Sequence, residues 1–304
     1  MHIRPFTTVD YPAVAAIHNA AFPKEPTTAG KMRDRDEHRH PKTRAERWVA
    51  EEDGQIIGVG EYSQSTDLYH PRKFQIIVYF HPDRQQHGLG GALYCHVART
   101  LSRFDPIAFQ ARAREDEAVC LRFLEARGFL EDFRTWESHL DVLAFDPLPW
   151  RSVETRVRAE SIRIVSLADL AGDPDRDGTI YDLEWETSRD IPSPPSITPN
   201  REELTVEERD VQFARYREGV LNGPDYPAGA FLVALRDGEY VGLSYGEADP
   251  ERRVLDIDVT GVRLAYRGRG IAQALKVRGI AYARENGYRT IRTWNDTVNR
   301  PILV

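Results

Sequence analysis

The chain has 304 residues, of which 41% are hydrophobic and 29% are charged, and its formal net charge is −7 at pH 7. This length and composition predict a globular protein of about two domains, because each half is long enough to bury a core. The acidic net charge argues against a nucleic-acid-binding protein, and no apolar run approaches the roughly 18 residues that a membrane span requires.

The pattern of the first half predicts alternating strands and helices with one early hairpin. Its hairpin turns at Asp53-Gly54, a pair favoured in type I′ turns. Glycine-rich sequence separates the strand that follows the hairpin from the next helix. In chain order, the expected strand, helix, hairpin, strand, helix, strand and helix lie at residues 2–7, 9–22, 47–63, 74–80, 88–101, 106–112 and 115–129.

The second half repeats this order, with a hairpin at Asp237-Gly238. Between the halves, Pro147, Pro149 and a charged stretch interrupt all periodicity. We therefore expect one domain at residues 1–145, a linker at 146–160 and a second domain at 161–304. The expected strand, helix, hairpin, strand, helix and strand of the second half lie at residues 161–166, 168–188, 230–248, 254–262, 270–283 and 289–295.

The glycine-rich turns are the clearest part of the repeat. Residues 79–101 align without a gap with residues 261–283, so that Gly88 matches Gly270, 182 positions later. A helix start offers unpaired N–H groups and the positive end of a dipole, and glycines let a ligand approach the backbone. Arg267 and Arg269 add positive charge, so this turn predicts a phosphate-binding cradle.

Each half resembles a GCN5-related N-acetyltransferase (GNAT) domain, and the tandem plan resembles that of mycothiol synthase. The family's pyrophosphate motif, Q/RxxGxG/A, is met by Gln85, Gly88 and Gly90 and again by Arg267, Gly270 and Ala272. The resemblance implies an α+β fold with a mixed, mostly antiparallel sheet in each domain, and acetyl-CoA or another acyl-CoA as the phosphate compound. The positions that it implies for acyl-CoA binding are Gly261, Val262, Leu264, Arg267, Gly268, Arg269, Gly270, Ile271, Ala272, Asn295 and Asn299 in the second half, and Phe80, Gln85, Gln86, His87, Gly88, Leu89 and Gly90 in the first.

Chemistry is expected in the second half. In this family an amine attacks the thioester directly, and a carboxylate near the fourth strand often accepts the proton. Alternation along residues 254–262 predicts that Asp256, Asp258 and Thr260 share one face. This face either borders the acceptor or is merely solvated. Asp258 is the first candidate for the base and Glu247 the second, although Glu247 also fits a surface charge at a hairpin end.

Other features separate the two copies. Asp256 and Asp258 align with Phe74 and Ile76, so the first half looks catalytically degenerate. Gly261 is expected to mark a bulge that opens the strand. The place of a tyrosine that often protonates the leaving thiolate is Leu124 in the first half and lies beyond residue 304 in the second.

The ending and the acceptor site leave alternatives open. The second domain is expected to lack its final helix and strand, so either the chain is a clipped form or another chain completes the sheet. A proline-rich segment at residues 190–210 is either an acceptor lid or a surface loop, and the run Glu184, Trp185 and Glu186 could receive a cationic amine or simply be part core and part solvated.

The function expected is an acetyl-CoA-dependent N-acetyltransferase that acts on a primary amine of a small molecule. The alternatives are an acyl-CoA-binding regulatory protein and an interaction scaffold, both without turnover. Cys95 and Cys120 show no metal-ligand spacing and are expected to be buried, reduced thiols, with no bound metal. The expected protein is cytoplasmic, a monomer or homodimer, without nucleic-acid or membrane partners.

Overall fold

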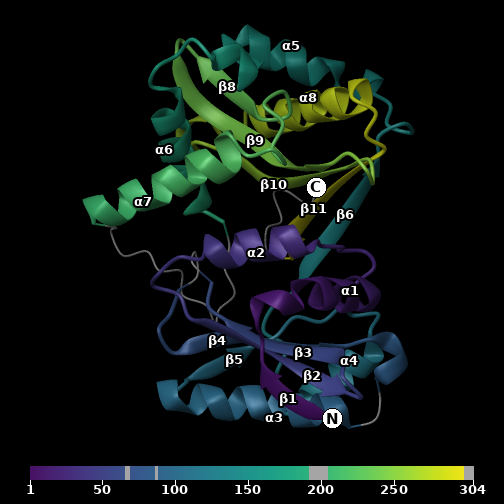
Figure 1. Cartoon of the computed structure of the whole chain (residues 1–304). Helices are drawn as coiled ribbons and strands as arrows, with labels where there is room; N and C mark the ends of the chain where they lie inside the picture. Colours follow the sequence, from purple (N-terminus) through teal and green to yellow (C-terminus); the bar gives the residue numbers. More distant parts are fainter. Residues whose placement is uncertain (66–68, 86–87, 192–204, 298–304) are drawn as a thin grey trace. The chain divides into compact units, whose positions relative to one another are not determined.

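The computed structural model describes residues 1–65, 69–85, 88–191 and 205–297. These residues fall into two compact units, one ending at Asp132 and the other beginning at Phe133. Each unit is built on one mixed sheet with helices against its faces (Figure 1). The predicted α+β class with two similar domains is confirmed.

The first unit has a five-stranded sheet in the order β1-β2-β3-β4-β5. Its neighbours are antiparallel except β4 and β5, which are parallel. The strands are β1 (His2–Pro5), β2 (Ala45–Glu52), β3 (Gln55–Ser63), β4 (Lys73–Phe80) and β5 (Ala108–Gln110). The helices are α1 (Tyr11–Ala21), α2 (Ala29–Glu37), α3 (Leu89–Leu101) and α4 (Ala118–Glu125).

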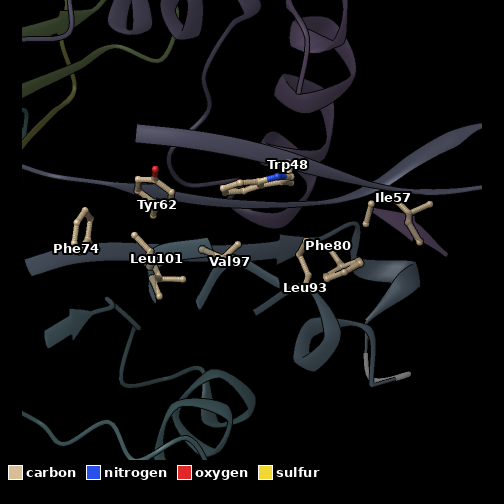
Figure 2. Close-up of a cluster of buried hydrophobic side chains, with 10 residues drawn as sticks. Trp48, Ile57, Tyr62, Phe74, Phe80, Leu93, Val97 and Leu101 are labelled. Carbon is tan, nitrogen blue, oxygen red and sulfur yellow. The ribbon is translucent and has the colours of Figure 1, made fainter. Parts of the chain in front are cut away.

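Hydrophobic side chains on the two faces of this sheet pack against different helices. Leu93, Val97 and Leu101 form a stripe along α3 and pack on one face, together with aromatic and aliphatic side chains of β2 and β4 (Figure 2). Tyr11 and Met32, from α1 and α2, pack on the other face. The alternation of β4 supplies both cores, because successive side chains point to opposite faces.

The second unit has a six-stranded sheet in the order β6-β11-β10-β9-β8-β7. Its strands are β6 (Thr135–Asp141), β7 (Ile162–Ser166), β8 (Leu232–Arg236), β9 (Glu239–Asp249), β10 (Val254–Val262) and β11 (Thr290–Asp296). Its helices are α5 (Arg151–Ala159), α6 (Arg176–Ser188), α7 (Val206–Tyr216) and α8 (Ile271–Glu285), with a π-helical turn (Arg217–Leu221) after α7.

The hairpins form as predicted in both units. Asp53 and Gly54 have φ of 51° and 75°, and Asp237 and Gly238 have φ of 51° and 86°. Two consecutive left-handed residues are the requirement of a type I′ turn, which matches the twist of the flanking strands. The Asp-Gly pairs therefore set the register of β2 with β3 and of β8 with β9.

Strand β6 corrects two expectations about the domains. It lies within the expected first domain, residues 1–145, but it pairs antiparallel with β11 of the second unit, from Thr135 opposite Asp296 to Asp141 opposite Thr290. The division between the units therefore precedes β6 and does not lie at residue 145. The edge of β11 that was expected to be unpaired is covered by a strand of this same chain.

The segment expected to be a linker, residues 146–160, contains helix α5. Val153 and Val157 lie one turn apart on this helix and are buried against Ile162 of β7 and Leu275 of α8. Two apolar residues at this spacing in a charged stretch are enough to hold a short helix to the sheet. This segment is thus part of the second unit.

Two further features of the described residues concern exposure. No helix in the described ranges has the length and apolarity needed to cross a membrane. Cys95 and Cys120 are both exposed, so the expectation of buried thiols is wrong. Cys95 lies between the buried stripe positions Leu93 and Val97 of α3 and faces away from the core.

Candidate active site

Both sheets separate at corresponding places between their parallel strands. In the second unit the pairing of β10 with β11 ends at Ile257 opposite Thr293, although β10 continues to Val262. In the first unit the pairing of β4 with β5 ends at Gln75. Gln75 and Ile257 are 182 positions apart, the offset of the sequence repeat. Each unit therefore opens a strand edge just before its glycine-rich turn.

Asp258 lies at a bulge in the open part of β10. The register of β10 with β9 shifts between Ile257 and Val259, so Asp258 has no opposite residue on β9. Gly246 faces this place, and a Cβ there would lie 1.7 Å from the carbonyl oxygen of Asp256. Only glycine permits so close an approach.

The expected bulge at Gly261 is not present, because Gly261 pairs regularly with Leu243. Gly261 has another reason to be glycine: a Cβ there would lie 2.4 Å from Oγ1 of Thr187. The residue therefore lets helix α6 approach the strand closely.

The bulge also changes which side chains share a face. Thr260 was expected beside Asp256 and Asp258, but its hydroxyl lies 2.9 Å from that of Ser244. Asp256 lies opposite Glu247 in the register, on the other face. The extra residue at Asp258 reverses the alternation beyond it, which simple period-two counting cannot foresee.

Asp258 has the properties of a base for reaction near neutral pH. Part of its surface is exposed to solvent, but the protein atoms packed around the carboxylate remove much of its hydration. This desolvation raises the pKa of Asp258 to about 6. The hydroxyl of Tyr226 donates to Oδ2 at 3.0 Å and partly opposes the rise. The carboxylates of Glu247, Asp256 and Glu184 add to it.

Asp256 is engaged elsewhere, which separates the two aspartates. Arg292 of β11 donates from Nε to Oδ1 of Asp256 at 2.7 Å and from Nη2 to Oδ2 at 2.5 Å. Arg292 is buried, at 7% exposure. Such a bidentate pair fixes the carboxylate of Asp256 in place, so Asp258 is the carboxylate of β10 that remains available to a substrate.

Helix α6 contributes one carboxylate to this region. The buried hydroxyl of Tyr245 donates to Oε1 of Glu184 at 2.7 Å, and burial together with Glu184 raises the pKa of Tyr245 well above 10. The next two residues of the run Glu184, Trp185 and Glu186 do not join this contact. Trp185 is exposed, and Glu186 lies 3.0 Å from Arg263. The acidic run therefore does not act as one patch.

The cradle of the second unit has the expected backbone. Gly268 and Gly270 have φ of 76° and 85°, and Gly270 is the N-cap of α8. Arg267 donates from Nε to the carbonyl oxygen of Val262 at 2.9 Å and from Nη2 to Asp190 at 2.5 Å. Arg269 pairs with Glu160 at 2.7 Å. Both arginines thus have a carboxylate partner.

Other predicted positions of this half divide between core and surface. Ile271 is buried and Ala272 partly buried in the core beneath the cradle, whereas Leu264 is 72% exposed. Asn295 lies on β11 beyond the last pair with β10, along the open edge. Asn299 lies outside the described residues.

The cradle of the first unit has the same backbone with different side chains. Gly88 is the N-cap of α3 with φ of 75°, and Gln85 donates to the carbonyl oxygen of Phe80 at 3.3 Å, as Arg267 does to Val262. The ring of Phe80 is in the core, and Leu89 packs against the same core. A Cβ at Gly90 would lie 3.3 Å from the ring of Phe123. Gln86 and His87 lie outside the described residues.

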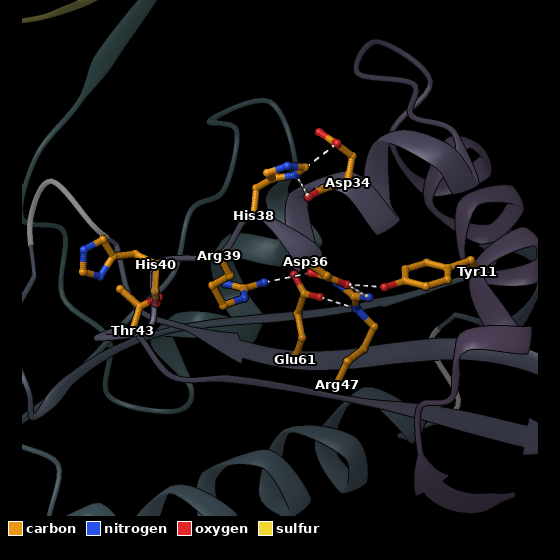
Figure 3. A network of polar contacts seen from close by, with 9 residues as sticks. All are labelled: Tyr11, Asp34, Asp36, His38, Arg39, His40, Thr43, Arg47 and Glu61. Atoms are coloured by element: carbon orange, nitrogen blue, oxygen red, sulfur yellow. Dashed lines mark hydrogen bonds and ion pairs between the residues drawn. The ribbon is translucent and has the colours of Figure 1, made fainter. Parts of the chain in front are cut away.

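In the first unit, the region between α2 and the sheet holds a compensated ion network (Figure 3). Arg47 lies 2.6 Å from Glu61 and 2.9 Å from Asp36, and its side chain is 7% exposed. Asp36 also accepts from Tyr11 at 3.0 Å and from Arg39 at 2.9 Å. Burial alone would raise the pKa of Asp36, but Arg47 and the other donors lower it.

Several site residues were missed by sequence reasoning. Tyr226, Tyr245 and Arg292 lie far from Asp258 and Glu184 in the sequence, and no motif marks them. Gly246 did carry a signal, as a glycine inside a strand pattern. Most of the proline-rich segment, residues 192–204, lies outside the described residues, and α7 begins at Val206.

Comparison with known proteins gives one family and several similar structures. The acetyltransferase (GNAT) family matches residues 11–129 and 180–301. A GCN5-related N-acetyltransferase from Sphaerobacter thermophilus superposes with a TM-score of 0.64 at 21% identity, covering 97% of this chain and 86% of that one. A tandem GNAT protein from the clavulanic acid biosynthesis pathway superposes with a TM-score of 0.70 at 16% identity, covering 99% of this chain and 92% of that one. A comparison with curated proteins gives no match.

Two copies of one α+β unit, each open between parallel strands before a glycine-capped helix, define a tandem protein with one fold in both halves. The chain belongs to the acetyltransferase (GNAT) family, and its two domains are GNAT domains in tandem. Membership implies acetyl-CoA as cosubstrate and an amine as acceptor. At these identities the structural likeness shows the fold alone.

Proposed function

We propose that the chain is an N-acetyltransferase whose second unit transfers the acetyl group of acetyl-CoA to a primary amine of a small molecule. The observation that carries this proposal is Asp258. It is bulged out of β10 where β11 separates, it is held by Tyr226, and its pKa is about 6. A carboxylate of this pKa is ionised at neutral pH and still basic enough to accept a proton.

The residues of the second unit fit the cosubstrate. Gly268 and Gly270 expose backbone at the start of α8, whose first N–H groups have no partner within the helix. A phosphate group would be held by these N–H groups and by Arg269. Among the described residues, the edge of β10 from Asp258 to Val262 has no partner on β11, and this edge and Asn295 would hold the pantetheine arm as an added strand.

The carboxylates favour a cationic acceptor. An amine arrives protonated at neutral pH, and Asp258, Glu247 and Glu184 attract it. Asp258 takes one proton, and the freed lone pair attacks the thioester carbonyl, which acetyl-CoA supplies. The C–N bond forms as the C–S bond breaks, the nitrogen releases its second proton to water, and the thiolate takes up a proton from water to leave as the thiol. Glu247 is the second candidate for the base.

The first unit is proposed to be structural. Glu61, an ion-pair partner of Arg47, lies opposite Ile77, next to the residue that aligns with Asp258, and Leu124 stands where a leaving-group acid would be expected. The test is a mass-spectrometric screen of primary amines with isotope-labelled acetyl-CoA and the whole chain. Acetylated products that depend on both substrates support the proposal. Acetyl-CoA binding without product from any amine would favour the alternative, an acyl-CoA-binding regulatory protein.

A further inference from the structure

The charges beside the second cradle are largely cancelled. Arg267 pairs with Asp190, and Arg269 pairs with Glu160. Arg263, which precedes the cradle, lies 3.0 Å from Glu186 and 2.6 Å from Glu239. An arginine that is already paired with a carboxylate attracts an anionic ligand only weakly, because the two charges of the pair nearly cancel. The motif arginines alone therefore leave a nearly neutral turn.

Arg156 brings a further charge to this turn from helix α5. A Cβ built on Gly270 would lie 2.7 Å from Nη2 of Arg156 and 3.3 Å from its Cζ and Nε. The guanidinium thus lies over the N-cap of α8, in space that only a glycine leaves open. It donates to Oε1 of Gln273, in the first turn of α8, at 3.4 Å.

Arg156 differs from the motif arginines in its partners. Within the described ranges, no carboxylate lies at ion-pair distance from Arg156. Its contact with Gln273 is long and weak, so the guanidinium keeps most of its hydrogen-bonding capacity. Val153 and Val157, on the buried side of α5, hold the helix in place. Arg156 is therefore a positioned, uncompensated cation at the helix start.

We propose that Arg156 is a binding residue for the pyrophosphate of acetyl-CoA, supplied by helix α5, which precedes strand β7. This inference rests on the proposed use of acetyl-CoA by the second unit. A guanidinium suits the group because its planar donors match two phosphate oxygens at once. The helix N–H groups approach the same oxygens along the axis of α8.

The experiment measures binding to the whole chain by calorimetry with three probes, namely CoA, 3′-dephospho-CoA and pantetheine. The variant is Arg156→Ala, which keeps helix propensity high. The matched control is Arg158→Ala on the same helix, whose side chain is 78% exposed and whose nearest acid, Glu154, lies 3.9 Å away. A thermal melt verifies that each variant remains folded.

We expect Arg156→Ala to weaken CoA and 3′-dephospho-CoA about tenfold each, as for a lost charge-assisted hydrogen bond, with pantetheine unchanged. Arg158→Ala should bind all three as the parent does. A loss confined to CoA would assign Arg156 to the 3′-phosphate and overturn the proposal, as would an unchanged affinity for both nucleotides. If the parent chain binds no CoA, the proposed function fails as well, so the two failures are distinguishable.

Discussion

The two units use one fold to produce opposite electrostatic environments beside the open strand. In the first unit, Arg47 forms ion pairs with Asp36 and Glu61, and the three charged side chains are mostly shielded from solvent (Figure 3). In the second, Asp258 projects from a bulge beside Glu247 and Glu184, and its pKa rises to about 6. The backbone opening is found in both units, whereas the carboxylate of raised pKa to which we assign proton transfer, Asp258, lies in the second.

This comparison also shows how a single backbone irregularity separates the copies. Strand β4 pairs with β3 without a register shift, whereas β10 carries a bulge at Asp258. The extra residue presents a carboxylate that a regular strand would not. Strand β4 therefore has no bulged residue like Asp258 among its described residues, and the aligned residue, Ile76, is buried in the core.

The largest expected effect is that of Asp258→Asn. The amide keeps the shape and the contact with Tyr226 but cannot accept the proton, so kcat/KM should fall by roughly 10² to 10⁴ at neutral pH, with CoA affinity little changed. For the parent, kcat/KM should rise with pH as Asp258 ionises near pH 6. The loss in the variant should shrink at higher pH, where the amine arrives deprotonated.

The matched control for this change is Asp237→Asn, the same chemical substitution in a hairpin turn of the second unit. Asn-Gly also favours a type I′ turn, so the fold is retained. Ile76→Asn, the control suggested by the alignment, is unsuitable because Ile76 is 4% exposed and a buried amide would destabilise the core. Full activity of Asp258→Asn at every pH would contradict the assignment of Asp258 as the base and make Glu247 the first candidate.

The raised pKa has a second consequence, for stability. In the folded chain Asp258 binds its proton up to about pH 6, whereas in the unfolded chain it releases it near 3.8. The folded state therefore holds more protons between these values, and its free energy of unfolding falls as pH rises through them. Asp258→Asn should thus be at least as stable as the parent at pH 7 in urea unfolding.

The next effect concerns the first unit. Arg47→Met removes a nearly buried cation, so that Glu61 loses its ion pair with Arg47 and Asp36 keeps, of its described ion pairs, only the one with Arg39, which should cost about 3 to 5 kcal/mol of the unit's unfolding free energy. The control Arg84→Met breaks an exposed pair with Glu52 and should cost less than about 1 kcal/mol. Urea unfolding measures both. If Arg47→Met costs no more than its control, the network is not what stabilises this region.

A smaller effect is expected at the second cradle. Arg269→Ala should weaken CoA binding by about 1 to 3 kcal/mol, because it removes a charge-assisted phosphate contact and leaves Glu160 near the anion. Arg278→Ala, an exposed change further along α8, is the control. Calorimetry on the whole chain should give the loss for Arg269 alone. Equal affinities would show that the backbone and other cations suffice.

Much of the fold could be predicted from the sequence, because local signals were consistent. Asp53-Gly54 and Asp237-Gly238 determined their hairpins, and β10 was predicted with its observed bounds. The sheet to which β6 belongs could not be predicted, since its alternation fits either sheet and its partner β11 lies about 150 residues away.

The candidate site could be predicted only where its residues are close in sequence. The glycines of the cradles and Asp258 came from local patterns, but Tyr226, Arg156 and Arg292 reach the site through tertiary packing. The bulge at Asp258 depends on Gly246 of the neighbouring strand, so a single-strand pattern placed it at Gly261.

The central claim, that the second unit alone carries turnover, is tested most directly by matched changes at the two helix N-caps. Gly270→Val and Gly88→Val place the same branched side chain at left-handed residues with φ of 85° and 75°, so the backbone strain is similar. A Cβ at residue 270 also meets the flexible end of Arg156 at 2.7 Å, whereas one at residue 88 meets no described atom within 4 Å. With an acetylated amine as the readout and folding verified by thermal melts, Gly270→Val should lower kcat/KM at least 100-fold and Gly88→Val less than twofold. The reverse order, or equal losses, would contradict the assignment of catalysis to the second unit.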